Sequence, residues 1–409
     1  MRPGTRTTGG DRLIRPFPDV SMPAPDAQAR VHSANVVARV RADIAASGGW
    51  LPFAAYMQLA LYAPGLGYYA AGARKFGADG DFVTAPELTS LFGRSLAVQL
   101  DAIRSCTGGD VLELGAGTGR LAADLLTALA DGASSDWRYR ILEPSPDLRE
   151  RQRATILARA GAPATRVEWI DALPQRIEGV VVMNEVLDAI PVNVVVRRDG
   201  QWFERGVVDA QGLQLEDRPL PAGTLRRLAQ ARFPGEGDYT SELNPAAEAL
   251  VASLAKRRSS GAVVVVDYGF PRHEYYHPQR AMGTLVAHYR HRVHSDPLLW
   301  PGLCDLTAHV DFTAIAAAAA RAGLDVAGFT SQAGFLLGCG IVDRLRDVGP
   351  PESIEYIREA SAVQTLLSPA EMGELFKVLA LARPGGMTWP GFGMRDMRHR
   401  LGLGNDDPT

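Results

Sequence analysis

One short stretch constrains the fold more than any other: a glycine-rich turn between an apolar strand and a helix. The strand covers residues 111–114, and the turn carries Gly115, Gly117 and Gly119. Glycine lets the backbone approach a ligand closely, and the helix that follows points free N–H groups toward it. This arrangement predicts an open α/β sheet that binds its ligand at the carboxyl ends of the strands.

Further apolar runs continue the pattern along the chain. With residues 111–114 as the first strand, residues 139–142, 167–170, 180–183 and 262–266 read as the second to fifth short strands. The first four are regularly spaced, and the strands alternate with helical segments. This alternation predicts a parallel sheet. The last two runs are about 75 residues apart, which exceeds the length of one crossover helix, so we expect an insertion between them.

The insertion opens with a hairpin signal. Residues 192–198 and 202–208 are strand-like segments rich in valine and aromatic residues on either side of an Asp-Gly pair at 199–200. Asp-Gly between two strands is a strong signal for a tight hairpin turn. An Asn-Pro pair at 244–245 then predicts the start of a helix.

The segments on either side differ in character. Residues 1–32 are rich in Pro, Gly and Arg without periodicity, which is typical of a mobile tail. Residues 36–46 and 52–62 have helical spacing. Thr84 and Glu87 form a Thr-x-x-Glu pattern, for which a capping box is a sufficient structural explanation.

The chain after the fifth strand begins with a long segment of weak periodicity. Residues 269–310 are rich in His, Tyr, Arg and Asp, and a loop of this length in a compact fold is more often functional than accidental. We expect a helix at 312–322, strands at 324–329 and 376–381, and mostly helix between them.

These elements predict one Rossmann-like α/β sheet with additions threaded around it. The expected units are a disordered tail at 1–32, a helical cover at 33–108, a core at 109–192 and 259–383, an inserted hairpin and helix lobe at 193–258, and a C-terminal tail at 384–409.

Composition limits the partners and the compartment. The chain of 409 residues is 46% hydrophobic and 22% charged, which is an ordinary globular balance, and its net charge of −3 supplies no global cationic field. We therefore expect no nucleic acid or membrane partner, and the oligomeric state stays open. Cys106, Cys304 and Cys339 are widely spaced, which favours a reducing compartment, and we expect a cytoplasmic protein. The start of the chain contains arginines and no acid before Asp11, so an organelle presequence is the alternative, with a mitochondrial location if the chain is eukaryotic.

Three acids lie at the ends of three successive strands. Glu113 suits the cationic amino acid end of S-adenosylmethionine better than a pyrophosphate, which a carboxylate would repel. Glu143 is placed to accept both ribose hydroxyls, and Asp171 to accept from the adenine amino group. NAD enzymes also use an acid at the second strand, but their last motif glycine is replaced here by Arg120. A methyltransferase is favoured, and an NAD-dependent oxidoreductase is the weaker alternative.

The fourth strand ends in the candidate catalytic residues Asn184, Glu185 and Asp188. On a helical turn the two acids share one face, where they could clamp a guanidinium and orient it for methyl transfer. The alternative is that Asp188 only caps the turn before Pro191.

Histidines gather after the fifth strand, with five of the eight within residues 273–294. The spacing of His288, His291 and His294 could suggest a metal, but methyl transfer from a sulfonium needs no Lewis acid, and structural zinc needs an ordered set of four ligands. We predict no metal. A pocket role for His291, His294 or His309 is favoured over a surface one.

Several ordered motifs together resemble the MidA-like methyltransferases, whose mitochondrial members act as complex I assembly factors. The likeness spans about residues 34–395. It rests on residues 67–69, 80–87, 91–93, 113–119, 184–191, 266–269 and 305–312. The chain departs from many members in two places. At 115–120 it has Gly-Ala-Gly-Thr-Gly-Arg where many members have Gly-Pro-Gly-Arg-Gly-Thr, and at 186–187 it has Val-Leu where they have an aromatic pair.

The resemblance implies a class I methyltransferase fold with S-adenosylmethionine as cofactor. Mitochondrial members symmetrically dimethylate an arginine on a core complex I subunit, so it implies protein arginine methylation on a respiratory-complex or other protein partner. A non-catalytic assembly factor or scaffold that keeps the cofactor is the alternative. The motifs add Asp81 and Phe82 on the cofactor side. On the substrate side they add Tyr68, Tyr69, Asp305, His309 and Asp311.

Overall fold

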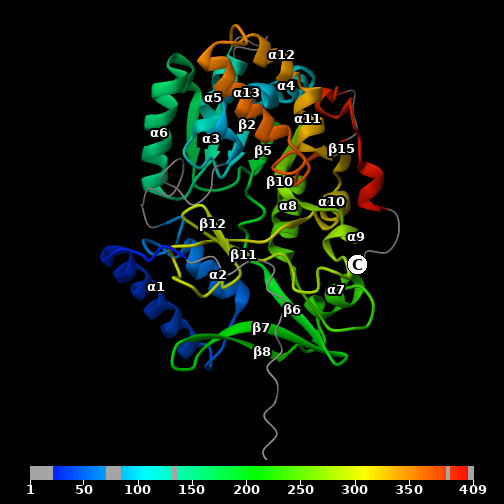
Figure 1. The fold of residues 1–409 in the computed structure, drawn as a ribbon. Coiled ribbons are helices and arrows are strands. Elements are labelled where there is room, and N and C mark those ends of the chain that lie inside the picture. Colours follow the sequence, from blue (N-terminus) through cyan, green and yellow to red (C-terminus); the bar gives the residue numbers. More distant parts are fainter. Residues whose placement is uncertain (1–21, 71–83, 131–135, 384–386, 404–409) are drawn as a thin grey trace, which may run out of the picture.

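The computed structural model describes residues 22–70, 84–130, 136–383 and 387–403. A central sheet with helices on both faces forms one half of the molecule, and a second sheet with the N-terminal helices forms the other (Figure 1). This confirms the predicted α/β fold. In the described part of the chain, no helix is both long enough and apolar enough to span a membrane.

The central sheet has eight strands, seven of which follow one another in space. In order they are β15 (Asp325–Ser331), β16 (Phe376–Ala382), β10 (Ala262–Phe270), β5 (Gly179–Asn184), β2 (Asp110–Leu114), β3 (Tyr139–Leu142) and β4 (Val167–Ile170), with β14 (Val310–Asp311) pairing β10. Strands β10 through β4 are parallel, whereas β16 runs antiparallel to both neighbours. The chain moves from β2 to β3 on one side and places β5 on the other, so a crevice forms at their carboxyl ends.

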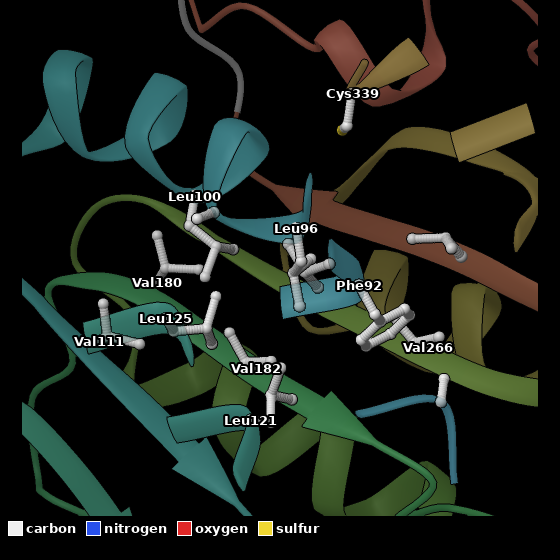
Figure 2. Close-up of a cluster of buried hydrophobic side chains, with 14 of the residues drawn as sticks. Phe92, Leu96, Leu100, Val111, Leu121, Leu125, Val180, Val182, Val266 and Cys339 are labelled. Atoms are coloured by element: carbon white, nitrogen blue, oxygen red, sulfur yellow. The ribbon is translucent and has the colours of Figure 1, made fainter. Parts of the chain in front are cut away.

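Both faces of the sheet are buried, which explains the continuous apolar runs in the sequence. Val180 and Val182 of β5 face the layer that contains α4 and α5, where Leu96 and Leu121 pack against the strands (Figure 2). Val181 faces the opposite layer. The first layer contains α4 (Ser90–Thr107), α5 (Arg120–Leu129), α6 (Pro146–Ala160), α11 (Gln332–Gly338), α12 (Ile341–Arg346) and α13 (Ile354–Leu367). The second contains α8 (Pro245–Arg257) and α10 (Phe312–Arg321).

The inserted lobe is built on a second sheet. Its strands are β1 (Leu51–Pro52), β7 (Gln201–Asp209), β6 (Asn193–Arg198) and β9 (Tyr239–Leu243) in spatial order, with β8 (Leu213–Pro219) pairing β7 and α7 (Thr224–Arg232) beside it. The predicted hairpin is confirmed: Arg198 pairs with Gln201, and both Asp199 and Gly200 have positive φ angles, as the tight turn requires.

The N-terminal segment belongs structurally to this lobe. Helices α1 (Ala27–Ala46) and α2 (Phe53–Tyr62) share a core with β6 and β7, and β1 adds a strand to the same sheet. Helix α1 starts earlier than the sequence predicted, because Asp26 caps it by accepting from the Ala29 N–H at 2.8 Å. The sequence did not show that β1 pairs with β7, since the two strands are about 150 residues apart in the chain.

The segment expected to be a long loop contains a small sheet. Its strands are β12 (Arg292–His294), β11 (Val286–Tyr289) and β13 (Asp305–Thr307), preceded by α9 (Arg272–Tyr275). The buried carboxylate of Glu242 anchors the start of this region by accepting from the backbone N–H of Thr284 at 3.0 Å and of Leu285 at 3.1 Å. Strands of three or four residues are too short for periodicity to reveal.

Two local predictions were wrong. The side chain of Thr84 caps no helix: α3 (Ala85–Leu88) ends after one turn, and Thr89 caps α4 instead. Residues expected in a C-terminal tail include the 3-10 helices η2 (Pro390–Phe392) and η3 (Arg398–Leu401), which pack Phe392 and Leu401 against the core. A further 3-10 helix, η1 (Ala162–Arg166), precedes β4.

Candidate active site

A cavity of about 770 Å³ lies at the carboxyl ends of β2, β3, β5 and β10, where α2 and the small sheet cover it. This is the crevice position expected for an open α/β sheet. It brings together most of the residues that the sequence singled out. They are Tyr68, Tyr69, Glu113, Gly115, Gly117, Glu143, Asn184, Glu185, Asp188 and Asp305.

Asp171 does not line the cavity. Its side chain is 84% exposed and forms an ion pair with Arg149, with 2.5 Å between Oδ1 and Nη2. This position does not support the predicted contact of Asp171 with the adenine amino group. Asp81 and Phe82 fall outside the described residues.

The remaining candidates on the substrate side are not among the residues that line the cavity. His309 is buried, stacks on Phe270 at 5.3 Å between ring centroids and meets the ring of Tyr268 edge-on. Asp311 caps α10 by accepting from the Ala314 N–H. His291 lies in the turn between β11 and β12 with a φ of 59°.

His294 does not line the cavity either. Its Nε2 atom lies 3.6 Å from Sγ of Cys304. His288, which the sequence did not single out for the pocket, is the histidine that lines the cavity. Burial and the neighbouring His294 lower its pKa to about 4, so the imidazole is uncharged near neutral pH.

The three glycines of the loop are required for different reasons. A Cβ on Gly115 would lie 2.9 Å from Cγ2 of Val186, and one on Gly119 would lie 3.0 Å from Cα of Gln152. Gly117 has a φ of 53°, and a Cβ there would meet no protein atom within 4 Å. Gly119 therefore permits close packing on α6, whereas the open side of Gly117 is space that a ligand can use.

The two strand-end acids beside this loop are both buried. Glu113 is 1% exposed, and its carboxylate accepts a hydrogen bond from the Tyr139 hydroxyl at 2.8 Å. Burial raises the pKa of Glu113 to about 7, against the opposing effect of that hydrogen bond. Glu143 accepts from the Ser145 N–H at 2.9 Å and from Gln152 Nε2 at 3.1 Å, and burial raises its pKa as well.

The candidate catalytic acids occupy the loop after β5. Glu185 has a φ of 54°, an uncommon backbone conformation for this residue type, and its carboxylate accepts from Asn184 Nδ2 at 3.0 Å and from the N–H of Ala85 in α3. Burial and the charge of Asp188 raise the pKa of Glu185 to about 8. The backbone strain is concentrated where the side chain enters the cavity.

Asp188 caps the turn, as one of the two interpretations of the sequence expected, and it also lines the cavity. Its carboxylate accepts from the N–H of Ala189, as a turn cap would, and from the Tyr268 hydroxyl. It also lines the cavity, where burial raises its pKa to about 6. Among the described residues, its Oδ1 atom and Oδ1 of Asn184 are buried acceptors with no hydrogen-bond partner.

Asp267 holds this loop in place, a role that the sequence did not reveal. It is fully buried within β10, and its Oδ2 atom accepts from the N–H groups of Val186, Leu187 and Asp188 at 3.2, 2.9 and 3.4 Å. Its Oδ1 atom accepts from the N–H of Tyr268 at 2.9 Å. One carboxylate therefore sets the path of the backbone that presents Glu185 and Asp188.

We expect Asp267→Asn to lower the free energy of unfolding by about 1–3 kcal/mol, because asparagine has one carbonyl oxygen and cannot accept on both sides. Urea unfolding followed by circular dichroism measures the change. The exposed Asp325→Asn is the matched control on the same sheet and should change stability by less than about 0.5 kcal/mol. Equal stability of the two variants would contradict the anchoring role.

Aromatic residues line the same cavity. The Tyr69 hydroxyl donates to both carboxylate oxygens of Asp305, at 2.8 and 2.9 Å. Tyr62 stacks on Tyr69 at 5.4 Å between ring centroids and donates to the carbonyl of Ala189 at 3.0 Å. Tyr62 ends α2 and carries no sequence signal for this position, since it is about 120 residues from the loop that it contacts.

The cavity is strongly acidic. Seven acids line it, whereas Arg120 and His288 are its only basic residues among those described. Glu87 already engages Arg120 at 3.3 Å and accepts from the Thr118 hydroxyl at 2.5 Å. The sequence predicted that Glu87 would complete a capping box, but its carboxylate contacts Thr118 and Arg120 at the glycine loop. A cavity of this charge favours a cationic ligand.

Comparisons with known proteins identify the family. A family model described as S-adenosyl-L-methionine-dependent methyltransferase matches residues 91–330. The chain belongs to this methyltransferase family. The mitochondrial protein arginine methyltransferase NDUFAF7 homolog of Drosophila melanogaster is 30% identical, with 93% of this chain and 91% of that protein covered. Human NDUFAF7, also named a mitochondrial protein arginine methyltransferase, is 28% identical, with 82% and 80% covered.

Two crystal structures of a Burkholderia thailandensis relative agree closely with this methyltransferase. One, described as a methyl transferase bound to S-adenosyl-homocysteine, has 48% identity and a TM-score of 0.89, covering 93% of this chain and all of the other. The native structure has 47% identity and a TM-score of 0.86 over the same shares of the two chains. The predicted MidA-like resemblance, enzyme class and cofactor are confirmed, and the NAD alternative was wrong.

The residues of this chain fit S-adenosylmethionine. The cavity volume is within the range of small-molecule sites, and the open side of Gly117 leaves room against the loop. The surrounding carboxylates match a cofactor that carries an ammonium and a sulfonium.

Proposed function

We propose that this methyltransferase methylates a guanidinium nitrogen of an arginine side chain in a protein partner. The observation that carries the proposal is the acid-lined cavity, in which Asn184, the half-buried Glu185 and Asp188 lie together, with an unpartnered acceptor oxygen on Asn184 and another on Asp188. A guanidinium has five N–H donors and no acceptor, so it complements this arrangement. The relatives named protein arginine methyltransferases support it.

On the cofactor side we assign roles to the acids beside the glycine loop. Glu113 would hold the ammonium of the amino acid end, Glu143 the two ribose hydroxyls, and Gly115 and Gly117 the close backbone approach. S-adenosylmethionine, when bound, supplies the electrophilic methyl group. Asn184, Glu185 and Asp188 would bind and orient the acceptor, which converts binding energy into alignment of the reacting atoms.

Glu185 is suited to take the proton that an arginine loses on methylation. Burial and the negative charge of Asp188 favour its protonated form in the free enzyme, with a pKa of about 8. A bound guanidinium between the two acids lowers that pKa, because an opposite charge within a few ångströms favours the carboxylate. The carboxylate can then accept the proton near neutral pH. Tyr62, Tyr69 and Asp305 would close the cavity against water.

Radiolabelled S-adenosylmethionine tests the proposal directly. The purified enzyme is incubated with proteins of a matching lysate, labelled bands are isolated, and the modified residue is identified by mass spectrometry. We expect methylarginine on at least one protein. Label on another residue type alone, or no label above that of an enzyme-free control, would contradict the proposal.

We also expect cofactor affinity to rise with pH. The pKa of Glu113 is raised to about 7, so its carboxyl group is largely protonated at pH 6 and cannot pair with an ammonium. Affinity should therefore increase by about tenfold from pH 5.5 to 7.5, since one pKa unit corresponds to about 1.4 kcal/mol.

Calorimetry with S-adenosyl-homocysteine in buffers of different ionisation enthalpy measures both the affinity and the proton released. In the Glu113→Gln variant the dependence of cofactor affinity on pH should become flatter, because this residue no longer titrates while the other titrating groups are unchanged. A wild-type affinity that is constant over the range would rule out the assigned role of Glu113.

A further inference from the structure

We propose that Gln152 is the positioning residue for ribose recognition, because it fixes the Glu143 carboxylate relative to the glycine loop. The inference rests on the proposed role of Glu143. Gln152 lies in α6, is fully buried and is not among the cavity-lining residues. It therefore acts through its neighbours.

Each hydrogen-bonding group of the Gln152 amide has a partner. Nε2 donates to the carbonyl of Gly117 at 3.2 Å and to Oε2 of Glu143 at 3.1 Å. Oε1 accepts from the indole N–H of Trp169 at 2.9 Å. A buried amide with two donors and its oxygen all used is held in a single orientation.

Trp169 determines which way round the amide lies. An indole nitrogen is only a donor, so the amide oxygen must face Trp169 and the NH₂ group must face Glu143. If the amide were reversed, its oxygen would oppose the carboxylate and its NH₂ would oppose the indole N–H. The β4 residue Trp169 thus sets the hydrogen bond that reaches the end of β3.

The same residue fixes the distance between the acid and the loop. A Cβ on Gly119 would lie 3.0 Å from Cα of Gln152, so the loop and α6 are in close contact. Ser145, the cap of α6, donates its N–H to the other oxygen of Glu143 at 2.9 Å. Ser145 and Gln152 thus each donate to one carboxylate oxygen of Glu143, and both oxygens still have lone pairs for the two ribose hydroxyls.

The test compares two ligands by calorimetry: S-adenosyl-homocysteine and its 2′-deoxy analogue. Wild type should prefer the ribose form. Gln152→Leu removes both donors at similar volume, and we expect it to weaken S-adenosyl-homocysteine binding by about ten- to a hundredfold. Affinity for the deoxy analogue should change much less, so the preference for ribose should approach that of a Glu143→Gln enzyme.

A general packing defect would weaken both ligands equally and leave the ribose preference intact, which would overturn the inference. If wild type itself shows no preference, the proposed ribose role of Glu143 fails, and the inference fails with it. If wild type shows the preference and Gln152→Leu retains it, only the inference fails.

Trp169→Phe is a second variant, which leaves the residues of α6 unchanged. It tests the same inference if Gln152→Leu folds poorly. It frees the amide to rotate, so we expect a smaller loss of ribose preference in the same direction. An unchanged preference in Trp169→Phe would overturn the orienting role of the indole. Exposed Gln214→Leu is the control and should bind both ligands as wild type does.

Discussion

Replacing Glu185 by glutamine should reduce methyl transfer by about 10²- to 10⁴-fold, the range typical of a lost general base. Glutamine keeps the shape of the side chain, and its single carbonyl oxygen can still accept from Asn184 Nδ2. It cannot take a proton from the acceptor, and it removes one of the two negative charges that face a guanidinium. The loss should therefore appear mainly in kcat.

The measurement is the rate of radiolabel incorporation into the methylated protein, together with calorimetry of S-adenosyl-homocysteine. We expect cofactor affinity to stay within a few-fold of wild type, because Glu185 lies on the acceptor side of the cavity. Glu178→Gln, half-exposed near the start of β5, is the matched control and should retain full activity. An active Glu185→Gln enzyme would assign the proton transfer to another group.

Replacing Gly117 by valine should weaken cofactor binding by more than about a hundredfold. No protein atom lies within 4 Å of a Cβ at this position, so the branched side chain would occupy cavity space and not collide with the fold. The φ of 53° adds strain for a β-branched residue. Methyl transfer should fall in parallel, because the cofactor is the methyl donor.

Calorimetry with S-adenosyl-homocysteine measures this loss, and thermal unfolding checks that the variant folds. Gly212→Val is a useful comparison, since Gly212 also has a positive φ and an open Cβ position but lies in the lobe away from the cavity. It carries the strain without blocking the cofactor. Equal cofactor affinity in the two variants would mean that the loop does not contact the cofactor as proposed.

The sequence was most informative where chemistry and periodicity were local. Strands β3 and β4 were predicted with their observed bounds, and the hairpin turn at 199–200 followed from two residues. The acids Glu113, Glu143, Glu185 and Asp188 were found because strand ends in a parallel sheet meet at one edge, so a strand prediction also places the residues that follow it.

Local reasoning was least informative for residues that act across long sequence separations. Glu87 has the spacing of a capping box, yet its carboxylate contacts Thr118 and Arg120 of the glycine loop. Asp171 follows a strand as Glu143 does, but β4 is at the edge of the sheet, where an ion pair with Arg149 holds the carboxylate in solvent.

The sequence by itself determined the α/β class, the cofactor loop and the acids at the strand ends, because each depends on residues that are neighbours in the chain. Only the tertiary structure decided that Asp267 anchors the loop after β5 and that Gln152 bridges Glu143 and Gly117. It also decided that Tyr62 and Asp305 line the same cavity as those acids. A buried polar group must find its partners wherever the fold brings them, and that requirement leaves no periodic pattern in the chain.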